Sequence, residues 1–193
     1  DCVKSILTQN RDGYELIIVN DGSKDGSDLA IQQFKSNNKV KIFNTPHRGI
    51  SAAKNYGIAN STGKIILFID GDCIADNNVL SELANSFKDP AVGCVGGELR
   101  SVNNHSTLTK TIETMQNGVE RKWPFGANVA YTKKALERTG GFDEHMMNGE
   151  DAELYLKVLK LGFKSVFNSN IRVRTVNPDT FLKFFRQRIR WGT

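Results

Sequence analysis

Residues 64–73 read KIILFIDGDC, an apolar run that ends in two acidic residues separated by one glycine. A continuous run of large apolar side chains is typical of a β-strand buried on both faces, as in parallel sheets. Asp70 and Asp72 follow this run directly. Side chains two positions apart in an extended segment point the same way, so both carboxylates can address one ligand. The stretch therefore predicts a buried strand with a polar site at its end.

Buried strands followed by polar loops and helices recur on both sides of this stretch. Apolar runs at residues 15–19, 40–44 and 92–99 predict three further strands, separated by helical periodicity. Four such alternations indicate an open, mostly parallel twisted α/β sheet with helices on both faces. Ligands of such sheets bind outside the carboxyl ends of the strands. The loops after 15–19 and 64–69 lie at that end, so the sheet itself predicts a site there.

The second half of the chain is less regular. Residues 126–132 predict a short strand, and residues 150–162 predict a strong helix. Two further strands are predicted at 164–169 and 171–176. Pro178 favours a last helix that starts at this residue, because proline suits the first helical position.

The composition suits one globular domain. The chain has 193 residues, of which 39% are hydrophobic and 24% are charged. No apolar run approaches the ~20 residues that span a bilayer, and no secretory signal opens the chain. Because the sequence lacks an initiator Met and opens within a predicted helix, we expect a fragment of a longer chain. Missing flanks could carry membrane segments.

The net charge of +5 comes from 26 basic and 21 acidic residues. The basic residues crowd toward the end of the chain: Arg172, Arg174, Lys183, Arg186, Arg188 and Arg190. This excess suits a phosphate-bearing ligand or an anionic membrane surface. No nucleic-acid-binding motif accompanies it, so we expect no nucleic-acid partner. Three cysteines without metal spacing indicate a reducing, cytoplasmic compartment.

The acidic pair at the end of residues 64–69 is a candidate metal site. Carboxylate oxygens from Asp70 and Asp72 suit Mg²⁺ or Mn²⁺, which fill their remaining positions with phosphate and water. Gly71 would let a phosphate approach the backbone. The alternative is an ordinary acidic turn, which an isolated Asp-Gly-Asp forms more often.

Two earlier segments offer groups for a nucleotide. Asp21, in NDGSKDGS, could accept hydrogen bonds from a base or a ribose, or it could simply shape a turn and cap a helix. In GISAAKNYG, a helix follows Gly49, and the Lys54 cation could meet a phosphate or a base carbonyl. The alternative for Lys54 is a solvated position on an amphipathic helix.

Two later segments offer a base and further cations. Glu150 and Asp151 begin a predicted helix and could supply a general base for an alcohol. Favourable interaction with the helix dipole explains acids there equally well. Gln187, Arg190 and Trp191 lie on a basic helix, where Arg can bind phosphate and Trp can stack, or where Trp packs on the domain. The apolar side chains of this helix could rest on a membrane surface or on the domain.

Taken in this order, the segments resemble family 2 glycosyltransferases of the GT-A fold. The resemblance rests on IIVNDGSKDGS, GISAAKNYG, FIDGDC (the family's DxD motif), FGANVAYTKKAL, GGFDEHMMNGEDAEL and QRIRW (its QxxRW motif). It covers nearly the whole chain and implies one catalytic domain over residues 1–193. Its nucleotide-binding half would span about 1–100, and its acceptor-binding half about 101–193. The family's first strand should precede residue 1 and is missing.

The resemblance implies roles for the residues at the family's motif positions. On the donor side, Asp21 would contact the base, with Gly49 and Lys54 nearby. Asp70 would touch the ribose or the metal, and Asp72 would bind the Mn²⁺ or Mg²⁺ that bridges the diphosphate.

The later motifs carry the implied roles on the acceptor side. Gly126 and Asn128 would line the sugar and acceptor pocket. Asp151 would be the base, with Glu150 beside it. The residues implied to hold the diphosphate and the acceptor end are Gln187, Arg190 and Trp191.

The implied reaction is an inverting, hexosyltransferase-like transfer from a nucleotide diphosphate sugar to a hydroxyl. We expect a UDP-sugar donor and a carbohydrate or lipid-linked acceptor, in polysaccharide or glycoconjugate synthesis at the cytoplasmic face of a membrane. One base suffices, because the departing diphosphate needs no protonation, whereas a glycosidase needs two carboxylates.

A sugar-nucleotidyltransferase is the rival enzyme, although it usually needs a Gly-rich basic loop that this sequence lacks. An inactive nucleotide-sugar-binding module is the non-enzymatic alternative.

Overall fold

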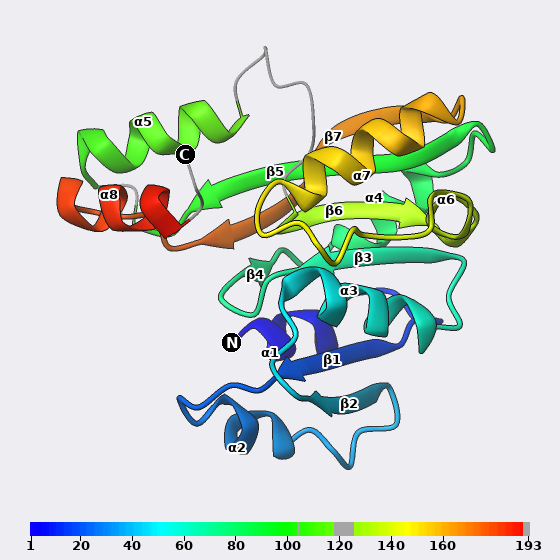
Figure 1. Ribbon diagram of the computed structural model, residues 1–193, viewed down its shortest axis with the longest axis horizontal. Helices are drawn as coiled ribbons and strands as arrows, with labels where there is room; N and C mark the ends of the chain where they lie inside the picture. Colours follow the sequence, from blue (N-terminus) through cyan, green and yellow to red (C-terminus); the bar gives the residue numbers. More distant parts are fainter. Residues whose placement is uncertain (104, 118–125, 191–193) are drawn as a thin grey trace.

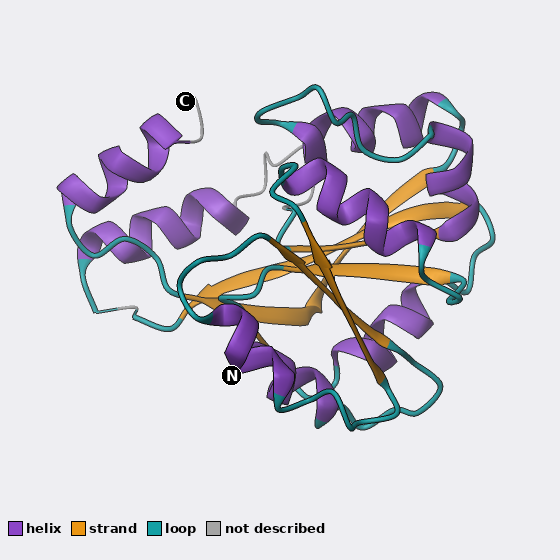
Figure 2. Cartoon of the chain, turned by 60° about the horizontal axis from the view of Figure 1, so that its bottom comes forward, coloured by secondary structure: helices purple, strands orange, loops and turns teal. Residues whose placement is uncertain are grey.

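A computed structural model of the chain describes residues 1–103, 105–117 and 126–190 (Figure 1). Its elements in chain order are α1 (Cys2–Leu7), β1 (Leu16–Asp21), α2 (Ser27–Gln32), β2 (Val40–Thr45), α3 (Ile50–Ala59), β3 (Ile65–Ile69), β4 (Ile74–Ala75), α4 (Val79–Ser86), β5 (Val92–Ser101), α5 (Thr107–Asn117), β6 (Asn128–Thr132), α6 (Lys133–Thr139), α7 (Glu150–Lys160), β7 (Lys164–Thr175) and α8 (Phe181–Arg190). Helices lie on both sides of the strands, as the sequence predicts (Figure 2).

The strands form a five-stranded sheet and a two-stranded sheet. The larger sheet has the order β3-β6-β5-β7-β4, and the smaller one pairs β1 with β2 in parallel. In the larger sheet β3, β5 and β7 run in one direction, while β6 and β4 run against them. The predicted α/β class is confirmed, with a mixed larger sheet.

The division into two sheets leaves apolar strands half-buried. Every residue of β1 and of β3 keeps intermediate exposure, although their apolar runs are typical of fully buried strands. Within the described part of the chain, β1 pairs only with β2, and β3 pairs only with β6. Each strand therefore has one edge without a neighbouring strand, which accounts for the exposure.

Residues 164–175 form one strand where the sequence predicts two. The pairing of β7 with β5 shifts register between Gly97 and Glu98, so that a short bulge joins the two predicted strands. The Asn128 Nδ2 donates to the carbonyl of Glu98 on β5 (3.0 Å), just after the shift, and to that of Ile171 (3.1 Å), in the unpaired part of β7. A Cβ on Gly97 would collide with Asn128 and Ile171, so the bulge requires glycine at this position of β5.

The last helix starts three residues later than predicted. Pro178 precedes α8, which begins at Phe181. The Thr180 hydroxyl accepts a hydrogen bond from the backbone N–H of Lys183 (3.3 Å), as an N-cap side chain does. Before the helix, the backbone of Asn177 exchanges two hydrogen bonds with the Asn103 side chain (2.7 and 3.0 Å). These bonds hold the chain ahead of the helix, so Thr180 caps α8 and Pro178 is not its first residue.

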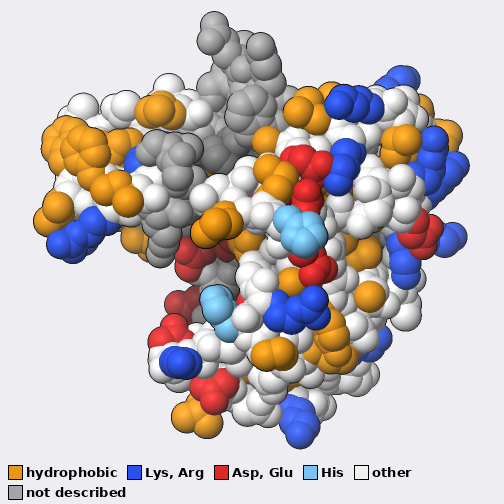
Figure 3. All heavy atoms as spheres, in the orientation of Figure 1, with side chains coloured by type: hydrophobic (Ala, Val, Ile, Leu, Met, Phe, Trp, Pro, Cys, Tyr) orange, Lys and Arg blue, Asp and Glu red, His pale blue; other side chains and the backbone are white. Residues whose placement is uncertain are grey.

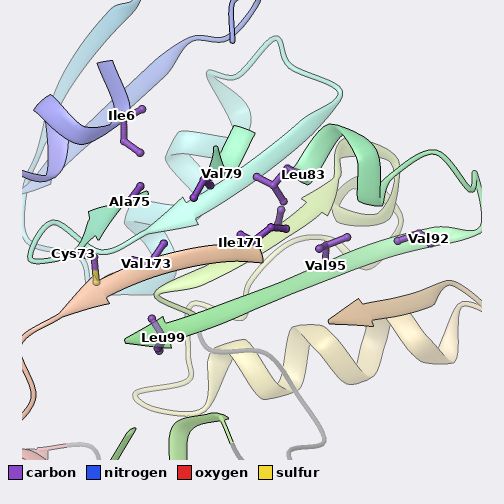
Figure 4. Close-up of a cluster of buried hydrophobic side chains, with 11 residues drawn as sticks. Ile6, Cys73, Ala75, Val79, Leu83, Val92, Val95, Leu99, Ile171 and Val173 are labelled. Atoms are coloured by element: carbon purple, nitrogen blue, oxygen red, sulfur yellow. The ribbon is translucent and has the colours of Figure 1, made fainter. Parts of the chain in front are cut away.

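The larger sheet has a hydrophobic core on each face. On one face, Ile6 of α1 and Val79 and Leu83 of α4 pack with Ile171 and Val173 of β7 (Figure 4). The core on the other face contains Val129, Tyr131, Leu136, Leu154 and Val158, from β6, α6 and α7. The second core fixes α7, whose first turn carries Glu150 and Asp151.

Candidate active site

The pairing of β3 with β6 assembles the centre of the site. Ile69 is the last residue of β3 and lies opposite Asn128, the first residue of β6. Because the two strands are antiparallel, the chain entering β6 at Gly126 passes beside the chain leaving β3 at Asp70. The predicted position of the acidic pair at the carboxyl end of a strand is confirmed.

Charges from three separate segments act on the Asp70 carboxyl. Loss of hydration is the main cause that raises the pKa of Asp70, even though more than a third of the residue remains accessible. Lys54 lowers this pKa, while the negative charges of Asp72, Glu150 and Asp151 raise it further. The net effect is a raised pKa. Four carboxyl groups therefore share this site with the ammonium group of Lys54.

Lys54 joins α3 to the first turn of α7. Its Nζ donates to Glu150 Oε1 at 2.9 Å, and the two side chains are only 10% and 11% exposed. The ammonium also lies 4.9 Å from the ring centroid of Phe142. The predicted alternative of a solvated lysine is therefore wrong, because this cation is buried against a carboxylate and an aromatic ring.

Asp151 is fixed by two backbone N–H groups. Its Oδ2 accepts from Gly126 at 3.0 Å, and its Oδ1 accepts from Ala152 at 2.8 Å. A Cβ on Gly126 would lie 3.2 Å from Lys54 Nζ and 3.5 Å from Asp151 Oδ2. The structure thus brings Gly126, Lys54 and Asp151 together from three elements.

Asp21 shapes the loop that leads into α3. Its carboxylate accepts hydrogen bonds from the backbone N–H groups of Arg48 (3.0 Å) and Gly49 (2.8 Å) and from the Thr45 hydroxyl (3.0 Å). Burial alone would raise the pKa of Asp21, but these hydrogen bonds outweigh it and lower the pKa. Gly49 has φ of 99°, which favours glycine. Asp21 therefore shapes a turn, as its alternative predicts, but neither α2 nor α3 has a side-chain cap hydrogen bond, so the predicted helix cap is wrong.

The remaining predicted site residues belong to β6 and to the last helix and its C-terminal side. Asn128 has no accessible surface, and its amide group holds the bulge between β5 and β7. Gln187 lies half-buried on α8 and lines a hollow with Asn177 and Lys183. Arg190 is the last residue of α8, and Trp191 lies outside the described residues.

Two residues with contacts at this site received no role from the sequence. Asn55, next to Lys54, bonds to the backbone of Phe142 and to the Glu144 carboxylate. Glu144 also accepts from Arg48 at 3.2 Å. The one sequence signal is the pair of glycines at 140–141, which predicts a tight turn against a neighbouring group.

The acidic groups fit a divalent cation that phosphate helps to bind. Within the described ranges, no three His, Cys, Asp or Glu side chains converge closely enough to hold a metal ion by themselves. Mg²⁺ and Mn²⁺ need no such cage, because one or two carboxylates plus phosphate and water suffice. The negative charges that act on Asp70 favour a cation beside it. Asp70 and Asp72 therefore fit this kind of metal.

None of the helices in the described part of the chain combines the length and the apolar character needed to cross a membrane.

Curated relatives of this chain are glycosyltransferases. The chain is 31% identical to the probable glycosyltransferase YdaM of Bacillus subtilis over 94% of its length, which is 48% of that protein. It is 26% identical to the poly-beta-1,6-N-acetyl-D-glucosamine synthase of Staphylococcus epidermidis, covering all of this chain and 50% of that one. The chain thus spans about half the length of these relatives.

Solved structures share the fold. The mannosyltransferase PcManGT from Pyrobaculum calidifontis, in complex with GDP-Man and Mn²⁺, matches with a TM-score of 0.79 and 21% identity over 97% of this chain and 55% of that one. Staphylococcus aureus TarS 1–349, in complex with UDP-GlcNAc, matches with a TM-score of 0.73 and 15% identity over 93% of this chain and 54% of that one. At these identities the likeness concerns the fold, which is that of GT-A glycosyltransferases.

The family follows from the sequence itself. Residues 1–147, about three quarters of the chain, match the profile described as Glycosyl transferase family 2. That span includes β1, α3, β3 and β6, which bring Asp21, Lys54, Asp70 and Gly126 to the site. The chain therefore belongs to glycosyl transferase family 2.

Proposed function

We propose that this chain is the catalytic domain of an inverting glycosyltransferase that moves a sugar from a nucleotide diphosphate sugar to an acceptor hydroxyl. The observation that carries the proposal is that Asp72, Glu150, Asp151 and the Lys54 ammonium, which pairs with Glu150, all act on the Asp70 carboxyl. These charges come from the end of β3, the start of α7 and the middle of α3. The carboxylates divide into a pair suited to a metal, Asp70 and Asp72, and a pair at the start of α7, in which Glu150 holds Lys54 and Asp151 is suited to proton transfer.

Asp72, together with Asp70, would hold the metal. A bound Mn²⁺ or Mg²⁺ would neutralise the charge that grows on the departing diphosphate. The Mn²⁺ in the PcManGT complex supports this choice of cation. The chain's own contribution is a strand end where carboxyl groups are close enough to oppose each other's ionisation.

Asp151 would be the base that takes the proton of the acceptor hydroxyl. Its two backbone hydrogen bonds fix the direction of the carboxylate and still leave an acceptor position on each oxygen. Glu150, in contrast, is committed to Lys54. We therefore assign proton transfer to Asp151. Glu150, beside it, would orient Lys54.

The remaining site residues would bind the donor and the acceptor. Asp21 and Gly49 would form the nucleotide side within residues 1–100, and Gly126 would leave room for the sugar. Asn128 would support this pocket from inside the sheet. The residues that we assign to the diphosphate and the acceptor end are the amide of Gln187, the cation of Arg190 and the ring of Trp191.

A UDP-sugar is the donor that we propose to test first. The TarS complex contains UDP-GlcNAc, and one relative is named a poly-N-acetylglucosamine synthase. We propose a carbohydrate or lipid-linked acceptor and a cytoplasmic location at the membrane face. For the location, the relevant feature is α8, which exposes Phe181, Phe185 and Ile189 at 68%, 58% and 77%.

Calorimetry of donor binding tests the proposal. The parent chain and Asp72→Ala are titrated with UDP-GlcNAc, UDP-glucose and GDP-mannose, each with and without Mn²⁺. We expect Mn²⁺-dependent binding of one donor by the parent and its loss in Asp72→Ala. Equal binding with and without Mn²⁺ in both proteins would contradict the metal role.

Product analysis separates the rival functions. Incubation of the bound donor with an acceptor panel should release a nucleoside diphosphate and give a product of inverted anomeric configuration. Release of pyrophosphate would identify a nucleotidyltransferase. Binding without turnover over the whole panel would identify a nucleotide-sugar-binding module.

A further inference from the structure

Two adjacent residues of α3 hold both ends of the segment that leads into α7. We call residues 142–150 the approach segment, because they connect the turn after α6 with the first turn of α7. Asn55 binds the start of this segment at Phe142 and Glu144. Lys54 binds its end at Glu150. One helical turn therefore controls where α7 begins.

The Asn55 side chain bonds to both backbone groups of a single residue. Its Nδ2 donates to the carbonyl of Phe142 at 2.8 Å, and its Oδ1 accepts from the N–H of Phe142 at 2.9 Å. The same Nδ2 donates to Glu144 Oε1 at 3.0 Å. Only an amide side chain supplies both a donor and an acceptor in this arrangement.

The turn before the approach segment is built to admit Asn55. Gly141 has φ of 78°, and a Cβ at this position would lie 2.6 Å from Asn55 Oδ1. Any other residue would be strained there and would push the amide away. The backbone of the turn and the side chain of Asn55 are thus fitted to each other.

The anchored residue is also fixed by the core. Phe142 is 3% exposed, and its ring packs edge-on against Phe68 of β3 with centroids 5.2 Å apart. The Lys54 ammonium lies over the same ring. Phe142 therefore connects the approach segment to both α3 and β3, next to the end of β3 that is followed by Asp70.

Glu144 extends the contact to the donor side of the site. It accepts from Asn55 through Oε1 and from the Arg48 guanidinium through Oε2 at 3.2 Å. The backbone N–H of Arg48 in turn donates to Asp21. The chain of contacts runs from the end of β1 to the approach segment.

We infer that Asn55 is a positioning residue, which sets the place of the Asp151 carboxylate through the approach segment. The inference rests on the proposed function, because it assigns Asn55 to the base of that reaction. Without Asn55, the approach segment keeps its anchor at Glu150 but loses the bonds at its start. Because a shift of ~1 Å at a reacting group costs about a hundredfold in rate, kcat should respond strongly.

The test compares Asn55→Ala with Asn60→Ala. Asn60 is the C-cap residue of α3, and its amide donates to the carbonyl of Tyr56 in the last turn of the helix at 2.8 Å. We expect Asn55→Ala to lower kcat by about 10- to 100-fold and to change the donor KM by less than about threefold. Asn60→Ala should leave both constants near those of the parent. A parallel rise in KM and fall in kcat would overturn the assignment.

Amide hydrogen exchange gives a readout that needs no substrate. Asn55→Ala should speed exchange in peptides that cover residues 142–150, while Asn60→Ala should not. Unchanged exchange in Asn55→Ala overturns the inference and leaves the proposed function standing. Faster exchange with unchanged kcat overturns the positioning role. A parent chain that turns over none of the donors contradicts the proposed function, and the inference falls with it.

A charge swap distinguishes positioning from general stability. Asn55→Asp keeps the acceptor for the Phe142 N–H, but it loses the donor to the Phe142 carbonyl and sets a carboxylate against Glu144. Adding Glu144→Gln supplies an amide donor opposite that carboxylate. We expect the double variant to exceed Asn55→Asp in kcat by up to about tenfold, since the contact with residue 144 is restored and the bond to the Phe142 carbonyl is not. A kcat no higher than that of Asn55→Asp would contradict the contact between residues 55 and 144. If Asn55→Ala fails to fold, Glu144→Ala, which removes the acceptor for Asn55 Nδ2, still tests this contact through exchange.

Discussion

The Nζ of Lys54 lies 2.9 Å from the Oε1 of Glu150, and both side chains are about nine-tenths buried. This pair joins α3, from the half of the chain with β1 and β2, to α7, from the half with β6 and β7. An ion pair with so little water around it makes each charge depend on the other. The ion pair between Lys54 and Glu150 therefore contributes both to the stability of the contact between α3 and α7 and to the electrostatics of the site.

Replacement of Lys54 should destabilise the chain strongly. Lys54→Met leaves the Glu150 carboxylate buried without its partner, which should cost about 3–5 kcal/mol of unfolding free energy. The measurement is urea denaturation at pH 7. Lys157→Met is the matched control, because Lys157 pairs with Glu153 in a more exposed pair within α7 and should cost less than about 1 kcal/mol. Equal losses of unfolding free energy in both variants would contradict a special contribution of the buried pair between Lys54 and Glu150.

Glu15 should control stability in acid. Burial would raise the pKa of Glu15, but hydrogen bonds from Lys41 and Thr62 outweigh it and lower the pKa from 4.5 to about 2. A lowered pKa in the folded state contributes stability above the unfolded value, and this stability is lost as pH falls from 4.5 toward 2. At about 1.4 kcal/mol per pKa unit, the loss is about 3 kcal/mol. Unfolding free energies of the parent and Glu15→Gln should therefore converge across this range.

Asp70 should have the opposite effect in the absence of metal. Its raised pKa means that the folded chain binds this proton more tightly than the unfolded chain does, so stability falls as pH rises through the unfolded value toward the folded one. Asp70→Asn should therefore raise the melting temperature at pH 7 and change it little at pH 3. With Mn²⁺ and a nucleoside diphosphate at pH 7, the parent should melt at a higher temperature than Asp70→Asn, because only the parent keeps both the Asp70 and the Asp72 carboxylates. A lower melting temperature for metal-free Asp70→Asn at pH 7 would contradict this account.

The strands of the first half could be predicted because each consists of a local apolar run. β1, β2, β3 and β5 all lie where such runs predict them. The continuity of β7 could not be predicted, because the bulge that joins its two parts depends on Asn128, 43 residues before Ile171. The start of α8 was misplaced because the Thr180 cap overrides the preference of proline for a first helical position.

The site was predictable in its parts and less so in its connections. The acids at the end of β3 and at the start of α7 stand out because each follows a strong element. The contacts of Asn55 could not be predicted, because its partners lie 87 and 89 positions away in the sequence. An amide side chain within a helix also gives no local signal. Sequence patterns predict which groups reach a site, whereas side-chain contacts across the fold decide how those groups are held.

Asp151→Asn should separate binding from chemistry. The amide can still accept from the Gly126 N–H, but it cannot take a proton, so donor binding should persist while kcat falls by about 10²- to 10⁴-fold. Donor affinity is measured by calorimetry and kcat by release of the nucleoside diphosphate. Glu153→Gln in the same helical turn is the control and should leave kcat unchanged. Turnover at the parent rate in Asp151→Asn would remove Asp151 as the base.

The apolar face of α8 should bind anionic lipid. Phe181, Leu182, Phe185 and Ile189 are 58–77% exposed and, at about 100° per residue, lie within about 100° of the helix circumference. Figure 3 shows hydrophobic side chains gathered at the left end of the molecule, where Figure 1 places α5 and α8. The half-buried face of the helix carries Phe184 and Gln187, so the exposed stripe is not the one that packs on the domain.

Vesicle flotation tests this assignment. Lys183 and Arg186 are exposed on the same helix and should favour phosphatidylserine vesicles over phosphatidylcholine vesicles. Phe185→Ser with Ile189→Ser should lower binding to phosphatidylserine vesicles by at least about tenfold, because each lost side chain removes ~1.5–3 kcal/mol of burial. Leu156→Ser on α7, where the leucine is 52% exposed, should have no effect. If the double variant instead abolishes self-association in sedimentation and vesicle binding is absent throughout, the stripe contacts a second protein surface, because burial of the same apolar area would then come from protein and not from lipid.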